Sequence, residues 1–163
     1  QIFLIKSKET SFCPICSGDL KVRDTRVRHI RNEHGEKETY QLRRLLCREC
    51  GKIHIELPDF MQPKKHYAAA VIEAAIDGTR GDCPADNSTI SRWKVEFVRL
   101  RQYLEGALLG LRSMRDRRNN ALLRKNSLLD QIREDGPGWL TCVTRMLVNT
   151  GSGLHTQFAC CPP

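Results

Sequence analysis

The stretch Cys13-Pro14-Ile15-Cys16 is followed, after 30 intervening residues, by a second Cys-x-x-Cys pair, Cys47-Arg48-Glu49-Cys50. Each pair forms a tight turn that brings two thiolates together, and two such turns supply the four ligands of a tetrahedral zinc ion. Gly18 and Gly51 lie close behind the pairs, where a tight turn favours a residue without a side chain. Because four thiolates leave no open coordination position, the sequence predicts one structural Zn2+ bound by Cys13, Cys16, Cys47 and Cys50.

Other interpretations of the cysteines have less support. A disulfide framework requires export, and the first residues, from Gln1 to Lys6, lack the features of a signal peptide. A thioredoxin-like redox site requires a βαβ unit, which the sequence does not indicate. Histidines could replace one cysteine ligand, but we expect them to be surface residues because four cysteines complete the shell; they are His29, His34 and His54. The other four cysteines have no ligand spacing, and they are Cys83, Cys142, Cys160 and Cys161.

The segments around the two pairs have the composition of β-strands. Residues 22–31 and 38–46 are rich in β-branched, aromatic and long side chains, and they flank a turn-like Asn32-Glu33-His34-Gly35-Glu36. After the second pair, residues 53–57 alternate apolar and polar side chains up to Pro58. Three strands with two cysteine turns at one end form a zinc ribbon. We therefore predict a three-stranded zinc ribbon over residues 1–63.

Arginines crowd the predicted hairpin. Arg23, Arg26 and Arg28 lie on its first strand, and Arg43, Arg44 and Arg48 on or just after its second. Guanidinium groups make paired, charge-assisted hydrogen bonds to phosphate, so the first three are candidate DNA contacts. The same cations could form a solvated face balanced by nearby carboxylates, and ribbons also bind proteins.

A helical region is predicted over residues 64–111. Residues 67–77 are rich in alanine and end at Gly78, and a second helix begins at Asn87 or Ser88. Apolar residues recur on one side of that second helix at helical spacing, in a stripe of Ile90, Trp93, Phe97, Leu100, Leu104, Leu108 and Leu111.

The two helices have the order of a helix-turn-helix module. In such modules the first residues of the second helix face DNA. The candidate contacts are accordingly Ser88, Thr89, Ser91, Arg92 and Lys94. The connection is longer than the usual three or four residues, so the alternative is that the two helices merely pack on each other and on the ribbon.

The C-terminal part, residues 112–163, begins with a basic stretch. Its Arg115, Arg117 and Arg118 are candidate phosphate contacts, or a solvated connector. After Gly136-Pro137-Gly138, a last helix is expected to bury Trp139, Val143, Met146 and Leu147, before a loosely ordered tail.

The whole-chain composition favours a polyanionic partner. Lys and Arg number 27 against 19 Asp and Glu, a net charge of +8, and the pI is about 9.3. No apolar run is long enough to cross a membrane, so we expect a cytoplasmic protein. We find no nuclease-like acid cluster, no glycine-rich phosphate loop and no nucleophile paired with a base. We therefore predict an α+β protein that binds zinc and DNA and is not an enzyme.

Several of these stretches together resemble a domain-of-unknown-function family of bacterial zinc-ribbon proteins. They include Cys13-Pro14-x-Cys16, Val22-Arg23-Asp24-x-Arg26, Leu42-Arg43-Arg44-Leu45-x-Cys47, Lys65-His66-Tyr67, Thr89-Ile90-x-Arg92-Trp93 and Gly138-Trp139-Leu140. Members of that family are often encoded near transposases and integrases, and the order of ribbon and helices is similar to DNA-binding regions of insertion-sequence transposases. The resemblance implies a bacterial accessory factor or regulator of a mobile element. The alternative is an adaptor that docks a transposase, integrase or polymerase.

Overall fold

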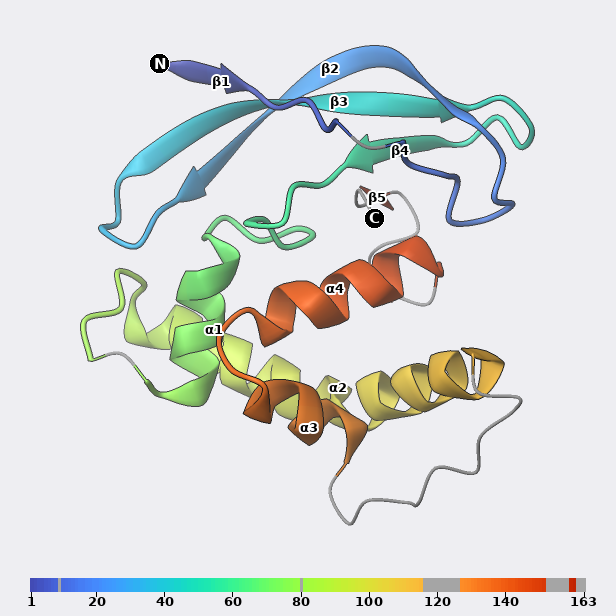
Figure 1. Cartoon of the computed structure of the whole chain (residues 1–163). Helices are drawn as coiled ribbons and strands as arrows, with labels where there is room; N and C mark the ends of the chain where they lie inside the picture. The colour runs from blue at the N-terminus through green and yellow to red at the C-terminus, as the bar shows by residue number, and fades with distance from the viewer. Residues whose placement is uncertain (9, 80, 116–126, 152–158, 161–163) are drawn as a thin grey trace.

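A five-stranded sheet lies above a layer of four helices (Figure 1), in a computed structural model that describes residues 1–8, 10–79, 81–115, 127–151 and 159–160. The chain is therefore an α+β protein, as predicted. Among the described residues, no helix is both long enough and apolar enough to span a membrane. In chain order the elements are β1 (Ile2–Leu4), β2 (Leu20–Arg31), β3 (Lys37–Cys47), β4 (Ile53–Glu56), α1 (Ala69–Asp77), α2 (Asn87–Arg115), α3 (Leu128–Glu134), α4 (Trp139–Asn149) and β5 (Ala159–Cys160).

The long β2–β3 hairpin is the frame of the sheet. The two strands pair antiparallel from Leu20 opposite Cys47 to Arg31 opposite Lys37. At the tip, the Asn32 side chain accepts hydrogen bonds from the backbone N–H groups of residues 34 and 36, and Gly35 takes a positive φ of 78°. This is the chemistry of a tight turn closed by asparagine and glycine. The predicted strands at 22–31 and 38–46 and the turn between them are confirmed.

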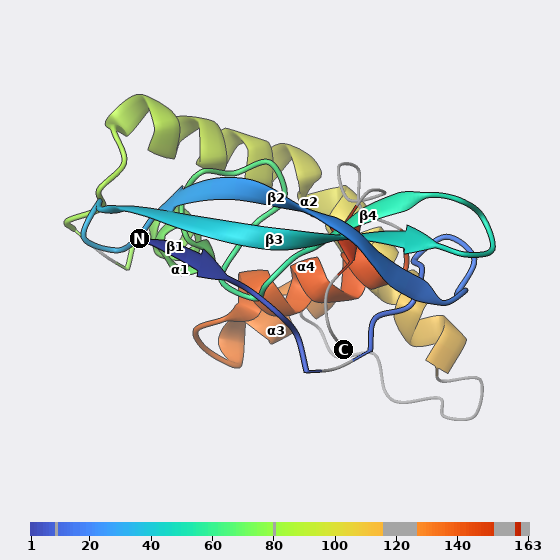
Figure 2. The same cartoon turned by 90° about the horizontal axis from the view of Figure 1, so that it is seen from above.

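β2 pairs with one edge of β3, and two shorter strands share the opposite edge. β4 pairs antiparallel with residues 44–46 of β3, as the predicted third strand requires, and β1 pairs parallel with residues 39–41. Seen from above, β1 runs beside β3 (Figure 2). The C-terminal β5 adds a short parallel pairing to β4. The sequence predicts neither β1 nor β5, and β5 lies within the segment expected to be a tail.

Three apolar clusters hold the layers together. The first joins the sheet to α4 and comprises Ile30, Leu42, Leu57, Met61 and Val148. The second packs α1 on the start of α2 through Val71, Ile72, Ala75, Ala85 and Trp93. The third joins α2, α3 and α4 through Leu108, Leu129, Trp139, Val143 and Leu147. The predicted stripe of α2 thus faces inward, and so do Trp139, Val143 and Leu147 of α4, while Met146 packs against the third cluster half-buried.

Arg28 ties the sheet to the segment that leads into α1. Its Nη2 donates hydrogen bonds to the backbone oxygens of Gln62 and, at 2.7 Å, of Lys65. The side chain is partly buried, and burial lowers the pKa of its guanidinium. Because Nη2 of Arg28 is already used inside the fold, this side chain serves to hold the sheet against the segment before α1.

Two glutamates, on two different helices, each cap the start of a third or fourth helix. Glu73 of α1 is 7% exposed, and its carboxylate accepts hydrogen bonds from the N–H groups of Gly138 at 2.7 Å and Leu140 at 2.8 Å. Glu105 of α2 does the same for Leu128 and Leu129 at the start of α3. The first N–H groups of a helix have no partner within the helix, and its positive end attracts a carboxylate. These caps therefore fix α4 against α1 and α3 against α2.

We predict that Glu73→Gln lowers the free energy of unfolding by about 1.5–3 kcal/mol, because it replaces two hydrogen bonds to a charged acceptor. Urea denaturation followed by circular dichroism measures this change. The control is Asp19→Asn, which removes the same charge from an exposed side chain and should leave the stability nearly unchanged. Equal stability of the two variants would show that the Glu73 cap contributes little.

Candidate metal centre

The four predicted cysteine ligands come together at one end of the hairpin. Cys13 and Cys16 lie in the loop before β2, Cys47 ends β3, and Cys50 lies in the turn to β4. Their Sγ atoms all lie within 4.8 Å of one another. Two of the separations are 3.7 Å, between Cys13 and Cys50, and 3.5 Å, between Cys16 and Cys47.

Backbone hydrogen bonds shape both cysteine turns. The N–H of Ser17 donates to the oxygen of Cys13, and the N–H of Gly51 donates to that of Cys47, so each turn closes on its own first cysteine. Gly51 has a positive φ of 68°, which favours glycine. At Gly18 a Cβ would lie 2.5 Å from the Glu49 side chain and 3.3 Å from the Cys16 sulfur. Glycine at this position lets the two turns approach.

The spacing of the sulfurs fits a bound metal and does not fit disulfides. A tetrahedral Zn2+ with Zn–S bonds of about 2.3 Å separates its sulfurs by about 3.8 Å, whereas a disulfide bond is about 2.05 Å long. All four cysteines are free thiols. The site is therefore compatible with a structural metal ion held by four sulfur ligands.

The thiols differ in acidity before a metal binds. Backbone hydrogen bonds, first from Cys50, lower the pKa of the Cys47 thiol to about 7. Although the Gly18 N–H lowers the pKa of Cys16, the Cys47 thiol and burial raise it, to about 12. A cation is thus needed to hold all four groups as thiolates at neutral pH, which couples metal binding to proton release.

His54 is where the sequence prediction is wrong. It is fully buried, with an exposed fraction of 0%, and its Nε2 lies 3.3 Å from the Cys13 sulfur. His29 and His34 are exposed, as predicted. An imidazole N–H at that distance can donate a hydrogen bond to a metal-bound thiolate, and such outer contacts orient ligands and tune the site.

The burial of His54 concerns one face of β4, which it shares with Glu56. Of these two residues, we expected His54 to be a surface residue. Both side chains are buried instead, because His54 lies against the Cys13 sulfur and Glu56 against the Arg43 guanidinium. Glu56, 3% exposed, accepts two hydrogen bonds from the Arg43 guanidinium, at 2.5 and 2.6 Å.

Residues 13–93 match the family model of a domain of unknown function, DUF6431. The match begins at Cys13 and ends at Trp93, so the region that matches DUF6431 contains the cysteine cluster, α1 and the first turns of α2. This agrees with the resemblance to a family of unknown function. Neither the curated proteins nor the solved structures contain a match to the chain.

The predicted DNA contacts fall into separate groups. Arg23 and Arg26 are exposed on β2. Five others open α2 at the end of the region that matches DUF6431, and they are Ser88, Thr89, Ser91, Arg92 and Lys94. Arg115 ends α2, about 36 Å from Ser91 along the helix axis. Nothing is described of the Arg115 side chain, and Arg117 and Arg118 lie outside the described residues.

Asp86 caps α2, directly before the predicted start of this helix at Asn87 or Ser88. Its carboxylate accepts hydrogen bonds from the Ser88 and Thr89 hydroxyl groups and from the Thr89 N–H, which together hold the pKa of Asp86 well below its usual range. Arg92 in turn donates to the Thr89 hydroxyl oxygen at 2.9 Å. Ser88 and Thr89 are therefore used within the cap, while Ser91 and Lys94 remain exposed.

We predict that Cys13→Ser loses the bound metal and loosens residues 13–56, because a preformed site exists only in the folded chain. Elemental analysis and the chelator sensitivity of thermal unfolding measure the two effects. The control is Cys142→Ser, at an exposed cysteine of α4, which should keep both metal content and stability. Unchanged metal in Cys13→Ser would disprove the assignment of this ligand.

We also predict that His54→Leu weakens metal affinity by about 10–100-fold, the usual cost of losing an outer-shell hydrogen bond. His54→Gln, which retains an N–H donor, should lose less. Competition with a chromophoric chelator measures the affinities, with the exposed His29→Leu as the matched control. If His54→Leu binds metal as tightly as the wild type, His54 only fills space beside the site.

Proposed function

We propose that this chain is a zinc-ribbon protein that binds DNA through its sheet and the first turns of α2. In this proposal it acts in the bacterial cytoplasm as an accessory factor or regulator of a mobile genetic element. The metal is structural Zn2+, since the four thiolates leave no open position for a reacting group. The mobile-element context rests on the family resemblance, and the DNA-binding role rests on the placement of charge.

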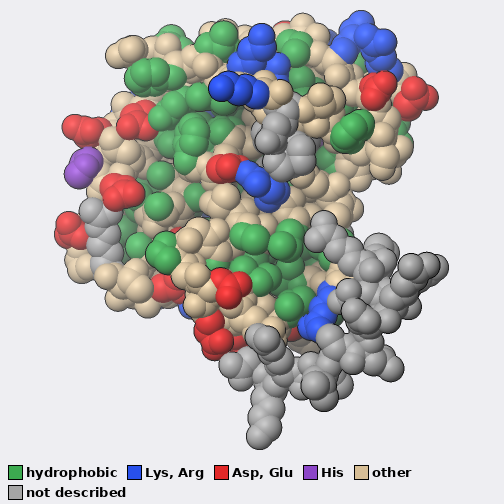
Figure 3. All heavy atoms as spheres, viewed as in Figure 1, with side chains coloured by type: hydrophobic (Ala, Val, Ile, Leu, Met, Phe, Trp, Pro, Cys, Tyr) green, Lys and Arg blue, Asp and Glu red, His purple; other side chains and the backbone are tan. Residues whose placement is uncertain are grey.

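Exposed cations on the cysteine-bearing half of the sheet carry the proposal. Lys21 and Arg26 on β2, and Arg48 and Lys52 in the turn after β3, are exposed. Within the described part of the chain, their side chains form no ion pair. Figure 3 shows Lys and Arg side chains gathered over the sheet-bearing part of the molecule. Cations without protein partners are available to phosphate, and neutralising phosphates releases counterions from DNA.

Three other arginines of the hairpin, unlike these exposed cations, have partners within the protein. Arg43 is paired with Glu56, and Arg44 makes a two-pronged ion pair with Asp24. Arg28 is held by backbone oxygens. These three side chains serve the fold, so the sheet separates cations that stabilise the protein from cations that remain available to a polyanion.

In this proposal, zinc orders the segment that carries Arg48 and Lys52 and makes no contact with the DNA itself. Arg48 lies between the ligands Cys47 and Cys50, and Lys52 follows two residues later. Their backbone positions are set by the cysteine turn, in which the Cys47 N–H donates to the Lys52 oxygen. Metal binding would therefore order the segment that presents both cations, and this gives a zinc-dependent DNA affinity.

The start of α2 is the candidate for contacts with base edges. Tyr67, just before α1, meets Trp93 of α2 edge to face at a ring-centroid distance of 5.1 Å. Ser91 and Lys94 are exposed on the first turns of α2. α1 ends at Asp77 and α2 begins at Asn87, so the connection is longer than in a standard helix-turn-helix. We therefore assign the larger part of the binding energy to the sheet.

Two exposed apolar residues favour a second candidate function. Phe12 is 58% exposed and Ile15 is 52% exposed, and both lie at the first cysteine turn. Large apolar side chains at a rigid turn are typical of a protein contact. The alternative is thus an adaptor that docks a transposase, integrase or polymerase through the ribbon.

Titration of labelled duplex DNA at several salt concentrations distinguishes the two functions. Arg26→Ala/Arg48→Ala should weaken binding to all sequences and reduce the slope of log K against log salt by about 2, one counterion per lost phosphate contact. Arg92→Ala should cost about 1–3 kcal/mol on a preferred site only. The control is Lys37→Ala, at the far end of the hairpin, which should change little.

The adaptor function makes the opposite prediction for these titrations. If the wild-type protein fails to shift duplex DNA even at low salt, or if the double variant binds as well as the control, the DNA-binding proposal is wrong. Phe12→Ser and Ile15→Ser, which leave the charges intact, should not alter DNA binding.

A further inference from the structure

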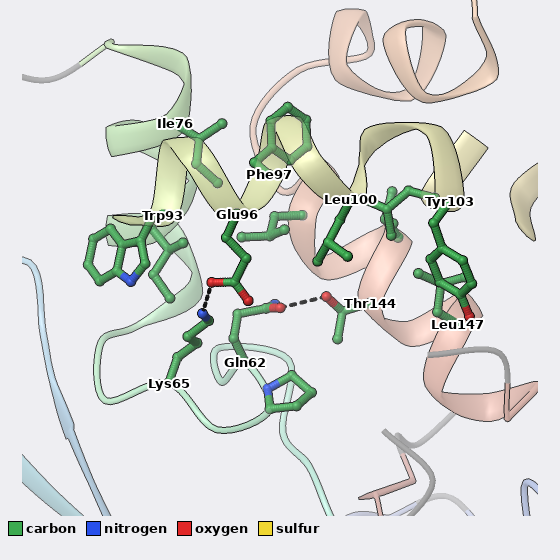
Figure 4. Close-up of a pocket in the computed structure, with 15 residues that line it drawn as sticks. Gln62, Lys65, Ile76, Trp93, Glu96, Phe97, Leu100, Tyr103, Thr144 and Leu147 are labelled. Carbon is green, nitrogen blue, oxygen red and sulfur yellow. Dashed lines mark hydrogen bonds and ion pairs between the residues drawn. The ribbon is translucent and has the colours of Figure 1, made fainter. Parts of the chain in front are cut away.

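An apolar cavity of about 150 Å³ lies between α1, α2, α4 and the segment that follows β4 (Figure 4). Its wall is formed mainly by aromatic and aliphatic side chains of the helices, among them Ile72, Trp93, Phe97, Leu100, Leu140 and Val143. A cavity of this volume with an apolar lining accommodates a body about the size of a benzene ring. The site lies away from the cysteine cluster and from the exposed cations of the sheet.

One buried polar atom in the cavity wall lacks a partner. Gln62 is 7% exposed, and its Oε1 accepts a hydrogen bond from the Thr144 hydroxyl at 2.6 Å. Its Nε2 is buried and makes no hydrogen bond within the described part of the chain. If the amide were turned over, the oxygen would be unpaired instead, so either orientation leaves one polar atom unsatisfied. A buried amide group without a partner is costly unless a ligand or water completes it.

A cation lies beside this amide. Lys65 also lines the cavity, and its Nζ pairs with Glu96 of α2, as Figure 4 shows. An ammonium group has three donors, so Lys65 can hold Glu96 and still donate to another acceptor. Arg28 of β2 binds the backbone oxygens of both Gln62 and Lys65, and it thereby holds the backbone from which both side chains extend.

We propose that this cavity binds a small aromatic or compact aliphatic carboxylate. The apolar body would pack among Trp93, Phe97 and Leu100, and the carboxylate would accept hydrogen bonds from Gln62 Nε2 and Lys65 Nζ. The polar side of this mainly apolar site also holds Glu96, whose charge the Lys65 ammonium balances, and the Thr144 hydroxyl. A mainly apolar lining with a few polar groups is the usual composition of a small-molecule pocket. The proposal is independent of DNA binding.

The test uses the full, zinc-loaded chain with 15N-labelled tryptophan side chains, and phenylacetate and ethylbenzene as probes. We expect phenylacetate to shift the Trp93 indole signal in a saturable way and to bind at least about ten-fold more tightly than ethylbenzene, because the site rejects a ligand that leaves its polar groups unpaired. Gln62→Met should abolish this preference. Gln102→Met, at an exposed position of α2, should retain it.

A second variant tests the cavity independently, in case Gln62→Met fails to fold. Leu100→Phe fills the cavity and should weaken both probes alike, while zinc content and circular dichroism stay those of the wild type. The proposal is overturned if phenylacetate causes no saturable shift of Trp93, since the cavity then holds only water. Equal binding of the two probes, or an unchanged preference in a folded Gln62→Met, overturns it as well.

Discussion

The convergence of four cysteine sulfurs is the constraint on which the N-terminal half of the structure depends. Cys13 must reach Cys50, 37 residues away, and Cys16 must reach Cys47. Sulfurs 3.5 to 3.7 Å apart repel one another once they are ionised, and only a bound cation offsets that repulsion. The same convergence sets the end of β3, the turn into β4 and the start of β2, so the pairing of the hairpin is fixed at its metal end.

A second set of interactions, hydrogen bonds from charged side chains to backbone groups, joins the sheet to the helical layer. Arg28 of β2 binds the backbone at Gln62 and Lys65, and these two residues line the cavity beneath α2 and α4. Glu73 then joins α1 to the start of α4, whose Val148 returns to the core under the sheet. Polar side chains therefore link elements that are distant in sequence, and the apolar clusters pack between the same elements.

Sequence patterns were sufficient wherever the governing interaction is local. Two Cys-x-x-Cys turns, a hairpin tip with Asn32 and Gly35, and an apolar stripe at helical spacing are each specified within a few residues. The cysteine cluster, the β2–β3 hairpin and the inward face of α2 follow them. The helix that starts at Trp139 is specified in the same way, by the glycines before it and the apolar spacing within it.

Features that depend on distant partners were not predictable. β1 and β5 are short strands whose pairing exists only because β3 and β4 offer free edges. His54 is expected at the surface because four cysteines complete the ligand shell, whereas the fold buries its ring against Cys13. Arg28 and Glu73 resemble ordinary surface charges in the sequence, and their bonds to backbone groups arise only from the packing of sheet and helices.

The central claim is that four cysteine thiolates bind one zinc ion and organise the DNA-binding surface proposed above. X-ray absorption spectroscopy of the purified protein at the zinc edge tests it most directly. The account predicts one zinc per chain with four sulfur neighbours at about 2.3 Å. A first shell containing nitrogen at about 2.0 Å, which would make His54 a ligand in place of a cysteine, or a protein purified with no tightly bound metal, would contradict it.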